Sequence, residues 1–299
     1  MYYLWLWLIL ISGAFLGLYD IFKKKALQRN TLFSVLALYS SLCFIIVAFE
    51  FTNAIQICRN NLLLILLKAV IIFFSWILGF ISIKNMPISV ITPFGTLSPL
   101  FSIILGIIVL NEKMGYIQLA GILIALLAYY FIGKAGAREV KGLFRSKYLY
   151  FMVLSMALSA TSALIDKIAL KNVNTGQLQF WFSLFLAALY ISAFLANKLF
   201  NKKESTNKKS EDTLLKNNIK KIPYFIILMS IFLVISDRIY YFAVKMPDSQ
   251  ISVIMPLRKI SILVSALVGG YIFKEENLKS KFYGMCLLGI GIILIFAGK

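Results

Sequence analysis

Histidine is absent from the 299-residue sequence, and cysteine and acidic residues are scarce. Without histidine, histidine-based catalytic triads and histidine-ligated zinc or haem are excluded. Cys43, Cys58 and Cys286 lie far apart with no CxxC spacing, so neither a metal ribbon nor a disulfide framework is indicated. Charged residues make up only 14% of the chain, against about 25% in ordinary soluble domains. The chain has too little polar material to cover a water-facing globule.

Apolar residues are abundant instead, at 61% of the sequence with a mean hydropathy of +0.87. A membrane-spanning helix requires about 20 mostly apolar residues. Ten such runs can be read, at 3–19, 32–51, 62–83, 87–110, 115–133, 148–166, 177–199, 222–243, 249–273 and 281–297. These runs do not alternate strictly, so they predict helices rather than a closed barrel. We expect an all-α integral membrane protein with ten transmembrane helices.

The two halves of the chain resemble each other. Residues 88–93 read ISVITP and residues 251–256 read ISVIMP, and a shift of 163 positions keeps further matches. The matched polar and small residues are Ser98/Ser261, Ser102/Ser265, Gly106/Gly269, Glu112/Glu275 and Gly121/Gly284, with Ser75/Ser236 upstream. This register predicts a five-helix repeat at 1–133, a basic connecting loop at 134–147, and a second repeat at 148–299 that contains a polar linker at 198–221. An odd number of spans inverts the second repeat, an arrangement common in transporters with a central substrate site.

Residues 86–133 resemble the EamA-type unit of the drug/metabolite transporter superfamily. The resemblance is carried by Pro93, Pro99, Glu112 and the Gln118-x-x-Gly121 pattern. The second copy keeps Pro256, Glu275 and Gly284, and departs at Ile262 and Arg258–Lys259. The resemblance implies a basket of helices around a central cavity, and secondary transport of small organic solutes, often export.

Four charged residues lie in the eighth and ninth predicted spans, where each requires a partner or a role. Asp237 and Arg238 lie in the eighth run, and Arg258 and Lys259 in the ninth. Counted from the turn between these runs, Asp237 and Arg258 reach about the same depth, roughly 14–17 Å from one membrane face. Asp237 can therefore pair with Arg258 or Lys259 and fix the helix packing. One carboxylate against three cations leaves an excess of positive charge, which favours an anionic or carboxylate-bearing solute; gating and proton coupling are further roles.

Asp20 and Asp166 end the first predicted helix of each half. They are either interfacial residues beside Lys23 and Lys167 or proton-coupling carboxylates. A helix C-terminus disfavours an anion, which supports the second reading.

Three further residues receive structural interpretations. Glu112 and Glu275 are predicted to be turn residues that pair with Lys113 and Lys274. Lys68, near the start of the third run, is predicted to extend toward the membrane surface.

Prolines interrupt the fourth and ninth predicted helices at Pro93, Pro99 and Pro256. Each removes one backbone hydrogen bond, and broken helices at matching positions of two halves point to a transporter's binding site. Hydroxyl groups of Ser98 and Ser261 can serve this site. Trp76, Tyr240 and Tyr241 can line the same cavity, although aromatic residues also simply pack or face headgroups.

The net charge of +19 lies mostly in loops rather than in a nucleic-acid-binding patch. The loops after odd-numbered helices carry 21 Lys and Arg residues, and the opposite face, with both termini, carries 6. The positive-inside rule places the first set in the cytoplasm and both termini outside. Relatives of the family are commonly drawn with cytoplasmic termini, so this orientation is open. We expect a multi-pass plasma (inner) membrane protein whose basic loops face anionic headgroups.

The leading prediction is a permease, expected to be an exporter, that moves an amino acid or another carboxylate-bearing or anionic metabolite by alternating access. Alternatives are a multidrug or cationic-compound exporter, a lipid-carrier flippase and a structural membrane bundle. No Walker motif, metal set or catalytic pair is present, so we expect no enzyme, cofactor or metal. The expected partners are a small-molecule substrate and lipid, without nucleic acid, in a monomer or homodimer.

Overall fold

The computed structural model describes residues 4–29, 31–85, 97–134, 146–204, 224–273 and 278–298. Every element in these ranges is a helix, as predicted. In chain order they are α1 (Leu4–Arg29), α2 (Leu32–Val47), η1 (Ala48–Glu50), α3 (Phe51–Ala54), α4 (Arg59–Asn85), α6 (Leu97–Leu110), α7 (Tyr116–Lys134), α8 (Lys147–Ala169), α9 (Thr175–Glu204), α11 (Tyr224–Lys245), α12 (Ile251–Arg258), α13 (Ile260–Phe273) and α14 (Leu278–Ala297).

Six helical stretches of the described chain are long and apolar enough to cross a membrane. They are Leu4–Leu27, Leu32–Ala54, Arg59–Ser82, Lys147–Ala169, Thr175–Leu199 and Tyr224–Lys245. Shorter apolar helices cover Ser98–Leu110, Tyr116–Phe131 and Cys286–Ala297. The protein is therefore an all-helical, multi-pass membrane protein.

Several helices continue beyond the apolar runs. The helix α1 ends at Arg29 rather than at residue 19, and α9 ends at Glu204, inside the predicted linker. Lysine, glutamate and glutamine have high helix propensity, so a helix does not stop where its hydrophobicity stops. Residues 205–221 of the linker and 135–145 of the connecting loop lie outside the described residues.

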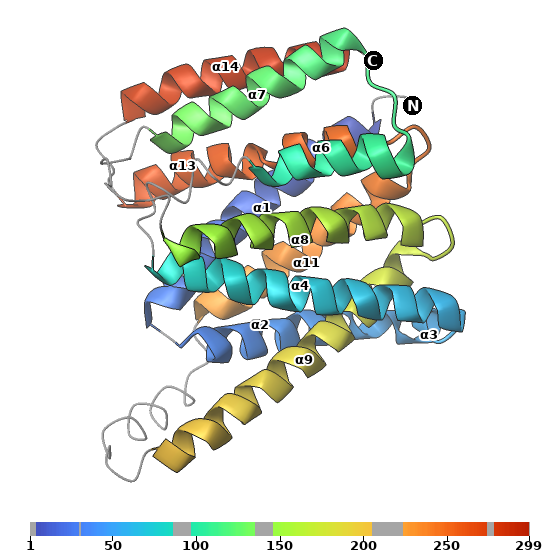
Figure 1. The fold of residues 1–299 in the computed structure, drawn as a ribbon, viewed down its shortest axis with the longest axis vertical. Helices are drawn as coiled ribbons and strands as arrows, with labels where there is room; N and C mark the ends of the chain where they lie inside the picture. The colour runs from blue at the N-terminus through green and yellow to red at the C-terminus, as the bar shows by residue number, and fades with distance from the viewer. Residues whose placement is uncertain are drawn as a thin grey trace.

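The helices lie roughly side by side, with α7 and α14 along one edge of the bundle and α9 along the other (Figure 1). The most extensive contacts join α1 to α11, α7 to α14 and α4 to α8. The helix α1 begins and α14 ends at one end of the bundle, which we call the terminal end. The opposite end, where α8 begins and α9 ends, we call the basic end, because it carries Lys147 and Lys198.

Small and hydroxyl-bearing residues occupy many helix contacts. At the crossing of α7 and α14, a Cβ atom on Gly121 would lie 2.8 Å from the carbonyl oxygen of Gly291. Thirteen serines are also buried in the described chain. In contrast, large apolar side chains such as Ile108, Phe49 and Ile293 are exposed on the outside. This distribution fits a bundle surrounded by lipid, in which close backbone approach and interhelical hydrogen bonds hold helices together.

The ninth predicted run is broken, as its proline predicts. It forms α12 and α13, with Pro256 inside α12 and a turn at Lys259. The Pro256 carbonyl accepts a 3.0 Å hydrogen bond from the Tyr129 hydroxyl. Pro99 lies near the described start of α6, and the residues directly before α6 lie outside the described residues, so its predicted helix interruption stays a prediction. Pro93 lies outside the described residues.

Candidate functional site

The turn that separates α12 from α13 packs directly against the backbone of α1. A Cβ atom on Gly13 would lie 2.7 Å from the carbonyl oxygen of Arg258, and one on Gly17 would lie 2.7 Å from that of Ser261. Only glycine permits this approach without a shift of the helices. The sequence analysis missed this contact, although the Gly-x-x-x-Gly spacing of these two residues signals close helix packing. Ser261 is accordingly buried against α1.

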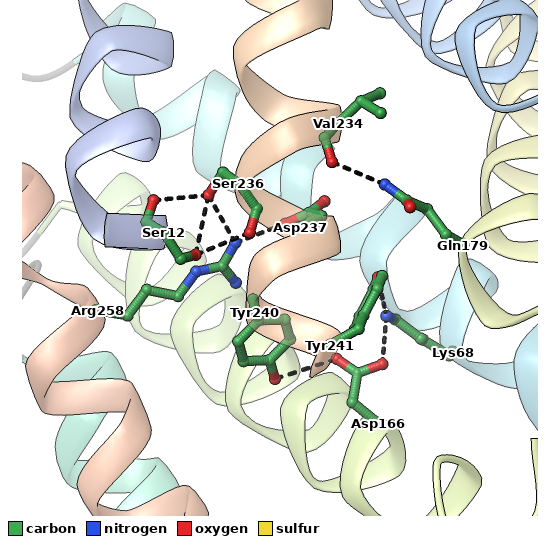
Figure 2. Close-up of polar contacts among 10 residues, drawn as sticks. All are labelled: Ser12, Lys68, Asp166, Gln179, Val234, Ser236, Asp237, Tyr240, Tyr241 and Arg258. Atoms are coloured by element: carbon green, nitrogen blue, oxygen red, sulfur yellow. Dashed lines mark hydrogen bonds and ion pairs between the residues drawn. The ribbon is translucent and has the colours of Figure 1, made fainter. Parts of the chain in front are cut away.

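A first ion pair lies directly beside this break. The guanidinium of Arg258 donates through Nη2 to Asp237 Oδ1 at 2.5 Å and to Ser236 Oγ at 3.2 Å. The guanidinium also lies 4.1 Å from the centre of the Tyr240 ring. The predicted pairing of Asp237 with Arg258 is thus present, between α11 and the end of α12 (Figure 2).

The serine that accepts from Arg258 also joins two helices. Ser12 Oγ donates to the Ser236 carbonyl, and Ser236 Oγ donates to the Ser12 carbonyl, each at 2.8 Å. Both serines are fully buried. This reciprocal pair connects α1 to α11 at the level of the ion pair (Figure 2).

A second ion pair, between Lys68 and Asp166, lies on the other side of α11 (Figure 2). Lys68 also donates to the Tyr241 hydroxyl at 2.9 Å, and the Tyr240 hydroxyl donates to Asp166 Oδ2 at 3.3 Å. Lys68 is only 2% exposed, so the prediction that it extends to the membrane surface is wrong. The helix α4 begins at Arg59, which places Lys68 well inside the bundle. Tyr240 therefore links both ion pairs into one polar network, since its hydroxyl contacts Asp166 and its ring lies beside Arg258.

A third pair joins Arg238 to Glu50 at 2.9 Å. With Glu50 and Asp166 included, three carboxylates pair with Arg238, Arg258 and Lys68, and Lys259 lies outside these three pairs. The sequence analysis did not consider Glu50, and it left Asp166 as either an interfacial or a proton-coupling residue. Lys259 follows Arg258 at the turn and is half-buried.

The predicted placements of the other acidic residues also change. Asp20 pairs with Lys23 at 2.7 Å, but α1 continues to Arg29, so Asp20 does not lie at a helix end. Asp166 does lie in the last turn of α8. Its partner is Lys68 rather than Lys167, which donates to the Val244 carbonyl.

Glu112 caps a helix of the other half rather than pairing with Lys113. Its carboxylate accepts the backbone amides of Ile251 at 2.7 Å and Ser252 at 3.0 Å, and the Ser252 hydroxyl at 2.5 Å. These are the first amides of α12, which otherwise lack helical partners. Glu275 lies outside the described residues.

Three helices and Trp76 of α4 enclose a small central hollow of about 20 Å³. It is lined by Tyr39, Ser40, Cys43, Trp76, Gln179, Phe182, Ser183, Leu186, Leu233, Val234 and Asp237. The Gln179 amide donates to the Val234 carbonyl at 2.9 Å, which leaves its Oε1 directed elsewhere. Neither Gln179 Oε1 nor the Tyr39 hydroxyl has a hydrogen-bond partner among the described residues. This volume holds about one water molecule.

The predicted site residues separate into two groups. Trp76 and Asp237 line the hollow, and Arg258 reaches it through Asp237. Tyr240 and Tyr241 belong to the polar network and do not line the hollow. Ser98 lies away from it in α6, where its carbonyl accepts from Ser102 Oγ.

A second, larger pocket of about 370 Å³ lies at the terminal end. It is lined by Glu50, Asn53, Asn174, Thr175, Gly176, Gln177, Arg238, Phe242 and Lys245. The sequence analysis did not predict this pocket, because its residues come from the ends of three helices that are distant in sequence.

These features define an all-helical membrane protein with a broken helix and a polar, ion-paired interior. Residues 3–134 match the model of the EamA-like transporter family. This match lies in the first repeat predicted from the sequence, and it confirms the resemblance to a family of membrane transporters noted there.

Solved structures share the fold. The crystal structure of one such protein matches with a TM-score of 0.74, covering 96% of this chain and 94% of that chain. The two sequences are 14% identical, so this likeness shows the fold alone. No curated protein sequence matches the chain.

Proposed function

We propose that the protein is a secondary transporter of an amino acid or a similar small metabolite that carries both a carboxylate and an ammonium group. The observation that supports this is the central hollow, where Asp237, the Gln179 carbonyl oxygen and the unpartnered Tyr39 hydroxyl converge. Carboxylate and amide oxygens accept hydrogen bonds from an ammonium group, and the neighbouring aromatic rings of Tyr39 and Trp76 favour a cation. Arg258, behind Asp237, offers a buried Nε donor that has no partner among the described residues.

The three ion pairs of the interior favour such a zwitterion over a purely anionic solute. Each carboxylate of the network already faces one cation, so an added anion alone would leave its charge uncompensated in a low-dielectric interior. A zwitterionic solute carries one charge of each sign and therefore adds no net charge. Asp237 and the aromatic rings leave one alternative, a cationic-compound exporter.

The proposed mechanism is alternating access within two inverted five-helix repeats. The hollow is too small for any metabolite, so a solute can enter only when helices move apart. The broken helix α12–α13 and the glycine contact with α1 offer a place for this movement. Export, the plasma membrane and outward-facing termini remain the expected direction, location and orientation, in a monomer or homodimer.

The experiment is a thermal-shift screen of the detergent-solubilised protein, followed by flux measurements in liposomes. The probes are the twenty amino acids, their decarboxylated amines and their deaminated acids. Ligands that bind only the folded state raise its apparent stability. Stabilisation and flux with amino acids alone support the proposal, whereas the same result with amines alone establishes the cationic-compound alternative. No flux with any probe would leave a structural bundle.

Tyr39→Phe gives a specific test of the hollow. The hydroxyl of Tyr39 has no partner among the described residues, so its removal should weaken solute binding severalfold with little loss of stability. Tyr190→Phe is the matched control, because that hydroxyl is also buried but donates to the Phe73 carbonyl at 3.4 Å. Equal solute binding by both variants would place the solute elsewhere.

A further inference from the structure

The pocket at the terminal end and the central hollow lie one after the other along the same three helices. On α2 and η1, Cys43 lines the hollow and Glu50 lines the pocket. On α9, Gln179 lines the hollow and Gln177 lines the pocket. On α11, Asp237 lines the hollow and the next residue, Arg238, lines the pocket. The two spaces are therefore successive parts of one possible route between α2, α9 and α11.

An apolar layer packs on the helices that line the two spaces. Val47 lies between Cys43 and Glu50 on α2 and is fully buried, and Phe180 of α9 is 4% exposed. The two belong to one apolar cluster, in which the ring of Phe180 lies 5.5 Å from that of Phe44. On the pocket side of this layer, the Glu50–Arg238 ion pair joins η1 to α11. The ion pair thus holds together two of the helices that would have to separate.

The pocket already binds a carboxylate, that of Glu50. This carboxylate accepts from Arg238 at 2.9 Å and from Asn53 Nδ2 at 3.1 Å. It also lies against the first turn of α9, where a Cβ atom on Gly176 would be 2.5 Å from Glu50 Oε2. Lys245 provides a second cation in the pocket. The pocket volume of about 370 Å³ is that of a small-molecule site.

We propose that this pocket is the first binding site of the transported solute, and that the solute's carboxylate replaces Glu50 on Arg238. Glu50 keeps its charge when it is displaced, so the solute's carboxylate adds one negative charge to the pocket, and Lys245 is the second cation there that can offset it. The exchange releases η1 from α11 and weakens the closed arrangement of the layer formed by Val47 and Phe180. This inference rests on the proposed function for the identity of the solute, but not for the existence of the gate.

Cys43 is a natural reporter for the opening of this route. It is 6% exposed and lines the hollow, whereas Cys58 and Cys286 are exposed and can be replaced by serine. In the resulting protein, a membrane-impermeant thiol reagent can modify Cys43 only when the route to the hollow is open. The rate of modification measures how often it opens.

The first test compares variants of the ion pair. Glu50→Gln should raise the rate of Cys43 modification about tenfold, which corresponds to a loss of about 1.4 kcal/mol from the closed state. Arg238→Gln breaks the same pair from the other side and should do the same, so the test stands if one variant misfolds. The matched control is Arg59→Gln, which removes an exposed cation at the same end of the bundle. Rates equal to that of the parent protein in both pair variants would overturn the gate.

The second test uses sodium acetate as the probe, with sodium chloride at the same ionic strength. Acetate should accelerate modification in the parent protein and have no further effect in Arg238→Gln, because the carboxylate has lost its cation. Equal acceleration by acetate and chloride would show simple screening of the ion pair and overturn the carboxylate site. Acetate without any effect on the parent protein would overturn it as well.

The third test concerns the side of entry and separates this inference from the proposed function. In oriented vesicles, the reactive face must be the one on which protease removes a tag placed at the C-terminus, because the elements that line the pocket meet at the terminal end, where α14 also ends. Modification from the opposite face alone would contradict the route. Flux is measured in parallel: a gate that responds in a protein without flux would disprove the transport proposal and leave the pocket standing.

Discussion

Two helix pairs are joined by the same hydrogen-bond pattern but have different surroundings. Ser12 and Ser236 connect α1 to α11, and Ser155 and Ser75 connect α8 to α4, in each case with both hydroxyls donating to the opposite carbonyl at 2.7–2.8 Å. Beside the first pair, Arg258 of a third helix contacts Ser236. Beside the second pair, the additional neighbour is another neutral hydroxyl, that of Ser159.

The ion pairs follow the same division. Lys68 and Asp166 join α4 to α8 a second time, so these two helices are held by serines and by charges together. Asp237 instead joins α11 to α12, beside the helix break. The comparison teaches that the same serine contact can serve a fixed pair of helices and a pair next to a movable segment. We expect changes in the first region to affect stability, and changes in the second to affect transport.

Lys68→Met should have the largest effect. It leaves Asp166 as a buried, uncompensated charge, which typically costs about 3–5 kcal/mol of unfolding free energy. The side chains of the pair are 3% and 5% exposed, so water cannot replace the lost partner. Chemical unfolding in detergent measures the loss. The double variant Lys68→Met, Asp166→Leu should recover most of it, and full stability in the single variant would remove the distinction between the two regions.

Arg258→Gln should reduce transport roughly tenfold to hundredfold, because it removes the contact that places Asp237 and the end of α12 relative to each other. Its loss of stability should be smaller than that of Lys68→Met, since the Arg258 and Asp237 side chains are 13% and 19% exposed. Flux in liposomes measures the loss of transport, and chemical unfolding of the same preparation measures the loss of stability. Lys259→Gln removes a positive charge one residue later and should reduce flux less than Arg258→Gln. A larger loss of flux in Lys259→Gln would shift the site to Lys259.

The two serine contacts can be compared directly. Ser75→Ala and Ser236→Ala each remove a hydroxyl donor to a backbone carbonyl, and each should cost about 1 kcal/mol of unfolding free energy. Only Ser236→Ala also removes an acceptor of Arg258, so only this variant should lower flux. Equal flux in the two variants would mean that the surroundings of the serines do not matter for transport.

Tyr240→Phe should have the smallest effect. It removes the 3.3 Å hydrogen bond to Asp166 and keeps the ring under Arg258, at a cost of about 0.5–1.5 kcal/mol. Tyr240→Leu, which also removes the ring, should be clearly worse in thermal unfolding. If the two variants unfold alike, the contact of the ring with the guanidinium contributes nothing.

The sequence predicted those parts of the protein that depend on local pattern. Apolar runs predicted the helices, Pro256 predicted the break, and equal depth on neighbouring helices predicted the pairing of Asp237 with Arg258. Helix ends were predicted less well, because hydrophobicity stops at the first charge while helix propensity does not. The early start of α4 at Arg59 is what places Lys68 deep in the bundle.

Contacts between distant helices could not be predicted from spacing. Glu50 meets Arg238 only because α2 packs against α11, and Asp166 meets Lys68 only because α8 packs against α4. The capping of α12 by Glu112 likewise joins residues far apart in the chain. One missed contact did have a local signal, the Gly13-x-x-x-Gly17 spacing on α1.

The capping of α12 by Glu112 also limits how early the protein can finish folding during its synthesis. The carboxylate is made long before the amides of Ile251 and Ser252 that it accepts, and α1, α4 and α7 make their largest contacts with helices that follow them in the chain. A ribosome-bound chain that ends near residue 134 therefore holds three helices in the membrane without their partners. Completion of the fold must wait for the last helices, so the early segments depend on the translocation machinery or chaperones until translation ends.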